Sequence, residues 1–151
     1  MKYTKLIMKI FLVLFFLSSK NLLAIEYSSE SSGKETYNFT INTKEGYSKQ
    51  IRKTEGTWTD SLGNYGVNTC VGTLIKDKRK IDLDLICENI DQDKDKNWSR
   101  VYRKKTIDDS VIGVVEYIDA TKKYKFLIGR KCNYALKFYE KSFFFFKHQC
   151  N

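Results

Sequence analysis

The chain has 151 residues, with 27 Lys and Arg against 18 Asp and Glu, four Cys, one His and no Pro. This length suits one domain, and the absence of Pro excludes Pro-rich linkers and collagen-like repeats. Aromatic residues make up 15% of the chain, which argues against a disordered tail. A single His excludes metal sites built on two His ligands.

Residues 1–24 have the composition of a secretory signal peptide. Three lysines precede an unbroken apolar run over residues 10–17, and Ala24 is a small residue suited to cleavage. The apolar run is shorter than the roughly 20 residues that span a bilayer. We therefore predict a secreted or periplasmic protein without a stable membrane anchor, and an uncleaved N-terminal anchor is the alternative. Because the leader carries four Lys and no acid, its removal lowers the net charge from +9 to +5.

The remaining chain alternates between apolar and polar residues, as strands do. Residues 25–34 are polar and Ser-rich, so we expect a loose N-terminal segment there. We expect strands near 35–43, 48–59, 65–76, 80–89, 97–105, 111–118, 123–129, 131–139 and 143–149. Turn-forming residues such as Asp60-Ser-Leu-Gly-Asn64 separate several of them.

Short strands joined by short loops favour an antiparallel meander. In a chain of this size the sheet hides its edges most readily by closing on itself. The sequence therefore predicts an all-β fold, with one antiparallel barrel of about eight strands over residues 35–151.

The four cysteines predict two disulfides, because an even number of Cys in a small exported protein is typical of paired thiols. Cys70 and Cys87 lie at nearly equal distances on either side of one turn, in two strand-like runs. Cys132 and Cys150 lie in the same way about a later turn. Opposed residues of antiparallel strands lie close enough for a disulfide. We therefore predict Cys70–Cys87 and Cys132–Cys150, each across one hairpin.

The register of the first of these hairpins is less simple. Alignment of its apolar faces pairs Ile75 with Ile81, which is one residue away from the register that joins the two cysteines. We therefore predict a β-bulge near residues 85–86, which turns Ile86 inward and places the disulfide on the outer face.

The last hairpin carries four consecutive phenylalanines at 143–146. We expect a buried final strand whose alternate rings face the barrel interior. In the register set by the disulfide, Leu136 faces Phe146, Phe138 faces Phe144, and His148 faces Tyr134.

Asp91-Gln-Asp-Lys-Asp95 resembles the first half of a calcium loop. However, Lys96 and Tyr102 stand where an EF-hand needs Gly and a bidentate Glu. We therefore predict a solvated hairpin turn.

His148 and Cys150 would suit a zinc site or a Cys–His catalytic pair only if the thiol were free. An oxidised Cys150 leaves a structural His. The chain also lacks the nucleophile, zinc-protease and phosphate-loop motifs. The sequence thus identifies no catalytic residue, no metal site and no cofactor.

The densest basic cluster is Arg100, Arg103, Lys104 and Lys105. We expect it to form a solvated face and predict no nucleic-acid partner, because the net charge is modest and Lys greatly outnumbers Arg, the more usual reader of phosphates.

Three short motifs carry resemblances. Gly56-Thr-Trp58 resembles the Gly-x-Trp of the first strand in lipocalin-like (calycin) proteins, where the Trp closes one barrel end. Residues 113–134 resemble the Gly-rich hairpin of allene-oxide-cyclase-like barrels, with Ala120 and Lys122 in place of two of its glycines. Trp58-Thr-Asp-Ser-Leu-Gly-Asn-Tyr-Gly66 together with Asp91-Gln-Asp93 looks similar to uncharacterised small secreted proteins of AT-rich marine bacteria, and this resemblance covers most of residues 54–150. These resemblances imply a small barrel and carry no activity with them.

The function that these observations favour is a binding or interaction module. Its partner would be a small apolar ligand at the barrel mouth or a protein, for example an enzyme that it inhibits. The alternative is a small barrel enzyme acting on a hydrophobic substrate. A hollow interior favours a pocket, whereas a solidly packed one favours a protein partner. The aromatic candidates for the ligand site are Trp58, Tyr65, Trp98, Tyr102 and Tyr134.

Overall fold

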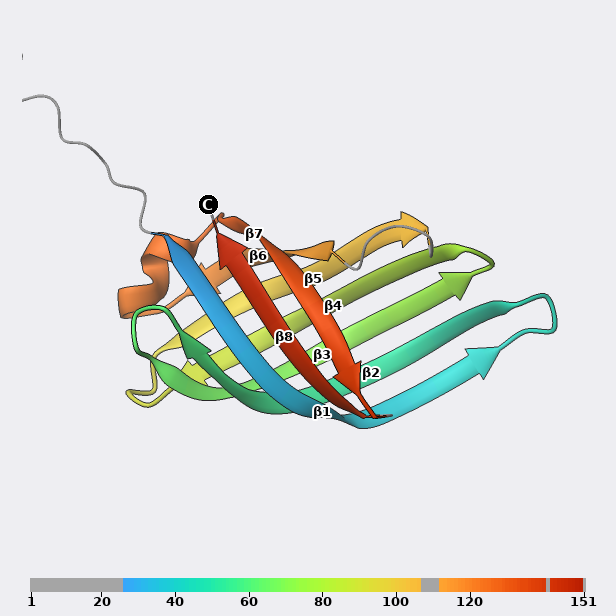
Figure 1. Cartoon of the computed structure of the whole chain (residues 1–151), viewed down its shortest axis with the longest axis horizontal. Coiled ribbons are helices and arrows are strands. Elements are labelled where there is room, and N and C mark those ends of the chain that lie inside the picture. The colour runs from blue at the N-terminus through green and yellow to red at the C-terminus, as the bar shows by residue number, and fades with distance from the viewer. Residues whose placement is uncertain (1–25, 107–111, 141, 151) are drawn as a thin grey trace, which may run out of the picture.

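The computed structural model describes residues 26–106, 112–140 and 142–150, and the proposed signal peptide lies outside them. Eight antiparallel strands follow one another around a closed barrel, with β1 paired to β8 (Figure 1). The strands are β1 (Tyr27–Asn42), β2 (Tyr47–Asp60), β3 (Tyr65–Asp77), β4 (Lys80–Asp91), β5 (Lys96–Thr106), β6 (Ile112–Ala120), β7 (Lys131–Tyr139) and β8 (Phe143–Cys150). The predicted barrel of about eight strands is confirmed.

The two ends of the barrel differ. At one end, which we call the capped end, the 3₁₀ helix η1 (Lys122–Leu127) lies beside the β2–β3 and β4–β5 turns (Figure 1). At the other end, which we call the mouth, the β1–β2 and β3–β4 hairpins project beyond β7 and β8. The cause is unequal length, because β8 pairs with β1 only as far as Lys34, while β1 runs on to Asn42.

The expectation of a loose segment at 25–34 is wrong. Residues from Tyr27 to Lys34 pair with β8 on one side and, from Ser29 onward, with β2 on the other. Tyr27 and Ser29 are buried inside the barrel. The Ser-rich stretch is therefore the strand that closes the barrel.

Both predicted disulfides are present, Cys70–Cys87 and Cys132–Cys150. The predicted bulge is absent, because the β3–β4 register runs without interruption, with Ile81 opposite Lys76 and Ile86 opposite Val71. The Cys70–Cys87 bridge faces the interior, and Ile86 and Val71 lie exposed outside. The tight turn after Asp77, with Lys78 at a φ of 51°, sets this register directly.

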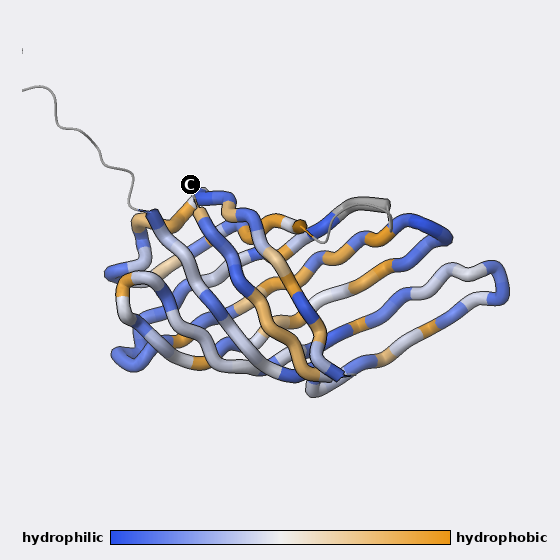
Figure 2. Tube along the Cα trace, viewed as in Figure 1, coloured by the Kyte–Doolittle hydropathy of each residue, from blue (hydrophilic) through white to orange (hydrophobic). Residues whose placement is uncertain are grey.

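The last hairpin has the predicted pairs. Tyr134 faces His148, Leu136 faces Phe146, and Phe138 faces Phe144. The rings of Tyr134 and Phe146 stack with centroids 4.8 Å apart. The tips of the β1–β2 and β3–β4 hairpins at the mouth are largely hydrophilic (Figure 2).

The strand expected at 123–129 is a 3₁₀ helix instead. Its residues Tyr124 and Leu127 are fully buried, and their spacing of three places both on one face of a 3₁₀ turn. This apolar face seals the capped end. No helix in the described part of the chain has the length and hydropathy that crossing a membrane requires.

Candidate functional site in the barrel lumen

The barrel interior is hollow. An inner chamber of about 90 Å³ adjoins a chamber of about 330 Å³ at the mouth. The two chambers share the side chains of Arg52, Leu83, Tyr134, Leu136 and Phe138, and we call the region where these residues separate the chambers the passage.

The wall of the inner chamber has two characters. Strands β6 to β8 contribute only aromatic or aliphatic side chains: Tyr117, Tyr134, Leu136, Phe138, Phe144, Phe146 and His148. Strands β1 to β5 add apolar groups and a set of short, uncharged polar side chains: Ser29, Ser31, Thr54, Asn68, Asn89, Asn97 and Ser99. Such small residues leave the space that bulky core residues would fill.

The structure brings two of the five predicted aromatic residues into the lumen. Trp58 and Tyr134 are buried in its wall. Tyr65 is 60% exposed, and it lines neither chamber. Trp98 and Tyr102 also lie outside the chambers, because their strand positions alternate with the inward-facing Ser99 and Val101.

Trp58 closes the lumen at the capped end. Its indole Nε1 donates a hydrogen bond to the carbonyl oxygen of Val67 at 3.1 Å, and its ring meets the edge of Tyr124 at 6.1 Å. The ring therefore packs against η1. Trp58 lies on the second strand of this barrel, whereas the Trp of the lipocalin-like motif lies on the first.

His148 lies in the inner chamber beside Tyr117, whose hydroxyl is 2.8 Å from Nε2. Burial lowers the pKa of His148 to about 4, so the ring is neutral at pH 7. Its other nitrogen, Nδ1, is buried and has no partner among the described residues. The histidine therefore offers one unused hydrogen-bonding atom inside the barrel.

The same histidine lies close to the second disulfide. Its ring nitrogen and the sulfurs of Cys132 and Cys150 lie within 4.8 Å of one another. Because those sulfurs are bonded to each other, they are not thiolate ligands, and this cluster offers a single nitrogen to a metal.

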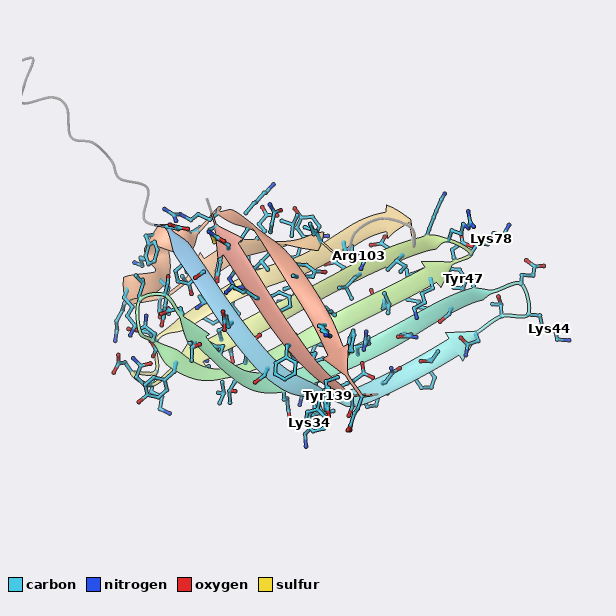
Figure 3. All side chains as sticks on the ribbon, viewed as in Figure 1. Lys34, Lys44, Tyr47, Lys78, Arg103 and Tyr139 are labelled. Carbon is cyan, nitrogen blue, oxygen red and sulfur yellow. A yellow bond between two sulfur atoms is a disulfide. The ribbon has the colours of Figure 1, made fainter. Side chains whose placement is uncertain are left out.

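Three basic side chains reach the mouth chamber: Arg52, Lys76 and Arg103. Arg52 forms an ion pair with Glu35 and lies 5.7 Å above the ring of Phe138. Arg103 lies within the open end of the barrel (Figure 3), and its Nε is buried without a partner among the described residues.

The prediction of a solvated basic face is therefore wrong for Arg103. Arg100 and Arg103 are three residues apart on one strand, so they point to opposite faces. Arg100 lies on the outside and forms a bidentate ion pair with Asp84 at 2.6 and 2.8 Å. The side chains of Lys104 and Lys105 lie outside the described residues.

Tyr134 stands between the two chambers. Burial raises the pKa of Tyr134, the positive Arg103 acts in the opposite sense, and burial prevails. A Cβ on Gly113 would overlap the Tyr134 ring, so this ring rests directly on the glycine backbone. The position of the ring thus depends on a residue without a side chain.

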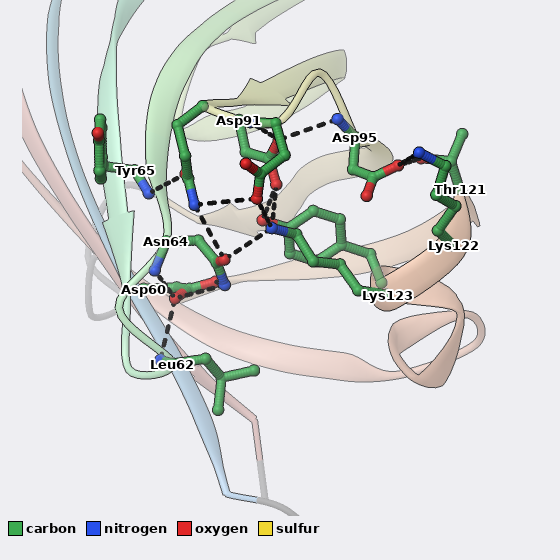
Figure 4. A network of polar contacts seen from close by, with 12 residues as sticks. Asp60, Leu62, Asn64, Tyr65, Asp91, Asp95, Thr121, Lys122 and Lys123 are labelled. Carbon is green, nitrogen blue, oxygen red and sulfur yellow. Dashed lines mark hydrogen bonds and ion pairs between the residues drawn. The ribbon is translucent and has the colours of Figure 1, made fainter.

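The capped end holds a dense polar network around Asp91 (Figure 4). Its carboxylate accepts hydrogen bonds from the Tyr124 hydroxyl at 2.8 Å and from the amides of Asp93 and Asp95 at 2.8 and 2.9 Å. The Lys123 ammonium completes the set at 2.7 Å. Burial alone would raise the pKa of Asp91, but these donors outweigh it and hold the pKa below its ordinary value.

The prediction of a solvated turn at 91–95 is therefore wrong for Asp91 and Asp95, which are 3% and 7% exposed. Lys123 also contacts Asp93 and the side-chain oxygen of Asn64. Its ammonium thus occupies the position that the calcium-loop resemblance would give to a cation. This arrangement is structural, because it ties η1 to two turns.

Sequence reasoning missed Lys76, Arg103 and the unused nitrogen of His148 as site atoms. The available signal was strand parity, since Lys76 and Arg103 share the inward parity of Cys70 and Val101. Charged residues on an inward face are unusual, and they indicate a lumen open to solvent.

Comparison of the chain with protein-family models, with curated proteins and with solved structures gives no match.

Proposed function

We propose that this protein is a binding protein that holds a small, largely apolar ligand in the barrel lumen. The observation that carries this proposal is the hollow interior, which is walled by aromatic and aliphatic side chains and continues into an open mouth. Ligand sites are typically concave, mostly apolar and provided with a few oriented polar groups. The inner chamber has all three properties, and the mouth chamber adds polar and basic side chains.

The closed architecture supports the same function. Both disulfides join neighbouring strands that line the lumen, and they suit an oxidising compartment such as the periplasm or the cell exterior. A wall held in this way keeps its shape when empty, which lowers the ordering cost of binding. A protein-binding module would gain nothing from an empty interior, so the lumen favours the small-ligand form of the hypothesis.

A second candidate function, catalysis on a bound hydrophobic substrate, has one observation in its favour. His148 is neutral at pH 7 and lies 2.8 Å from the Tyr117 hydroxyl inside the chamber. Such a pair is able to move a proton. Mass spectrometry of ligands recovered after incubation tests this candidate, because chemical change of the ligand that is lost in His148→Phe would favour the enzyme.

The binding function is tested with a matched pair of substitutions on β1. Ser31 lines the inner chamber, whereas its neighbour Ser32 is exposed on the outer surface. Ser31→Leu fills the lumen and Ser32→Leu does not. The assay is isothermal titration calorimetry of the exported, oxidised protein with 1-butanol as the probe, which has fewer atoms than a benzene ring and suits the inner chamber of about 90 Å³, followed by other small alcohols and acids.

We expect the wild type and Ser32→Leu to bind the probe, and Ser31→Leu to lose binding while keeping its fold by circular dichroism. Equal binding by both variants would place the probe elsewhere and refute the proposal. Absence of binding by the wild type to the probe and to every other alcohol and acid tested would refute it as well.

A further inference from the structure

Two buried side-chain nitrogens lack hydrogen-bond partners in the described part of the chain, and both lie on residues that line the lumen. Arg103, whose Nε is one of them, lines the mouth chamber, and His148, whose Nδ1 is the other, lines the inner chamber. Buried polar groups are rarely left unpaired, because each costs free energy when it is removed from water. A ligand that pairs with both would recover this cost.

The mouth chamber is positively charged. Among its three basic side chains, Arg52 is neutralised by Glu35, while Arg103 and the exposed Lys76 have no carboxylate in an ion pair within the described residues. No described acidic side chain lines either chamber. The described side chains that line the mouth therefore favour an anion.

The inner chamber requires different chemistry. Among the described residues its wall has no charged side chain other than Arg52, and most of its aromatic side chains come from β6 to β8. The passage is lined by Leu83, Leu136 and Phe138, which suit a methylene chain. At the inner end of the lumen, the ligand needs an uncharged hydrogen-bonding group to pair with His148 Nδ1.

On this basis we propose that the ligand is a short amphiphilic anion with polar groups at both ends. Its charged head binds Arg103 and Lys76, its chain lies in the passage, and its buried end makes a hydrogen bond with His148 Nδ1. This inference rests on the proposed binding function and specifies the chemical class of its ligand.

The chamber volumes limit the size of the ligand. A cavity of roughly 150 Å³ holds one benzene ring, so the inner chamber of about 90 Å³ holds fewer atoms than that. The head and the first methylenes occupy the larger mouth chamber. A chain of about six carbons therefore fits better than a long acyl chain. A terminal hydroxyl suits either tautomer of His148, because it donates and accepts.

The inference is tested by isothermal titration calorimetry with three probes of equal chain length. The first is 6-hydroxyhexanoate, which has both polar ends. Hexanoate lacks the terminal hydroxyl, and 1,6-hexanediol lacks the charge. We expect 6-hydroxyhexanoate to bind most tightly, about tenfold or more above each of the others.

Arg103→Gln and Arg100→Gln form the matched pair of variants, because both lie on β5 and remove one charge, one inside and one outside. We expect Arg103→Gln to weaken 6-hydroxyhexanoate binding by about tenfold to a hundredfold and to leave the diol unchanged. Arg100→Gln should change the affinities for 6-hydroxyhexanoate and for the diol by less than about twofold. His148→Phe should reduce 6-hydroxyhexanoate to the affinity of hexanoate.

Several outcomes would overturn the inference. If the diol binds as tightly as 6-hydroxyhexanoate, or if Arg103→Gln behaves like Arg100→Gln, then the anionic head is wrong. If hexanoate and 6-hydroxyhexanoate bind the wild type with equal affinity, the proposed hydrogen bond to His148 is wrong. In each of these cases binding of 1-butanol or of other small alcohols and acids would leave the binding function standing, whereas absence of all binding would end both proposals.

Discussion

Replacement of Asp91 by asparagine tests whether the polar network secures the capped end. The side-chain oxygen of the introduced amide would still accept from the backbone amides of Asp93 and Asp95, but its amino group would face the donors of Tyr124 and Lys123. Each hydrogen bond to a charged group contributes about 1.5–3 kcal/mol. Because Lys123 is one-third exposed and able to turn toward water, we expect a loss of about 3 kcal/mol rather than the upper end of the range for a broken buried pair.

The measurement is urea unfolding at pH 7 with both disulfides intact. Asp93→Asn is the matched control, because Asp93 contacts the same Lys123 ammonium at 2.8 Å but is 63% exposed. We expect that control to cost less than about 1 kcal/mol. Equal losses in the two variants would refute the idea that burial makes Asp91 important.

Acid titration gives an independent check. The pKa of Asp91 is lower in the folded protein than its ordinary value of 3.8. Its contribution is therefore fully present above that value and is lost as the pH falls through the folded-state pKa. The stability difference between the wild type and Asp91→Asn should shrink below about pH 4, and a difference that stays constant down to about pH 2 would contradict the assignment.

Three further predictions concern the residues around the lumen. Removal of the second disulfide by Cys132→Ala with Cys150→Ala should lower the free energy of unfolding by about 3 kcal/mol, measured in urea, since it closes a loop with a sequence separation of 18. Gly113→Ala should displace the Tyr134 ring, cost about 1–3 kcal/mol in the same assay and weaken probe binding. His148 is neutral when folded and takes up a proton when unfolded below its ordinary pKa of 6.5, so stability should fall by about 3 kcal/mol between pH 7 and pH 4, and His148→Phe should lack that part of the slope.

Each of these has a result that would count against it. Unchanged stability of the double cysteine variant would show that the bridge does not restrict the unfolded chain. Normal probe binding by Gly113→Ala would mean that the ring has room to move away from the lumen. Parallel pH curves for the wild type and His148→Phe would show that the ring is not held neutral.

The sequence was sufficient for the barrel, for both disulfides and for the pairing of His148 with Tyr134, because symmetric Cys spacing about a turn determines register. It was misleading where we assigned strands and faces from apolar side chains alone. Ser29 and Ser31 face the lumen, where small polar side chains leave space, so the alternation expected of a strand over a dry core is missing there. Alignment of the apolar faces of the β3–β4 hairpin likewise placed Ile86 inside, when it lies outside.

Other errors have different physical causes. Tyr124 and Leu127 have the spacing of a 3₁₀ turn, which is too short to give a periodic signal. The positions of Arg103 and Asp91 depend on contacts between strands far apart in the chain. Alternation along β5 would have separated Arg103 from Arg100, but the unpaired state of its Nε is a property of the folded barrel alone.

The pairing of β1 with β8 also determines when this protein is able to fold. The closing contact joins Tyr27 to Cys150, so nearly the whole of the described chain must be present before the barrel can form. Such distant contacts make folding slow, since a long loop must be ordered before the contact stabilises it. Until β8 arrives, β1 and β7 are unpaired edges that invite association with other chains. The bridge between Cys132 and Cys150 joins the closing strand β8 to β7, so once it has formed β8 stays in place beside the edge that it covers.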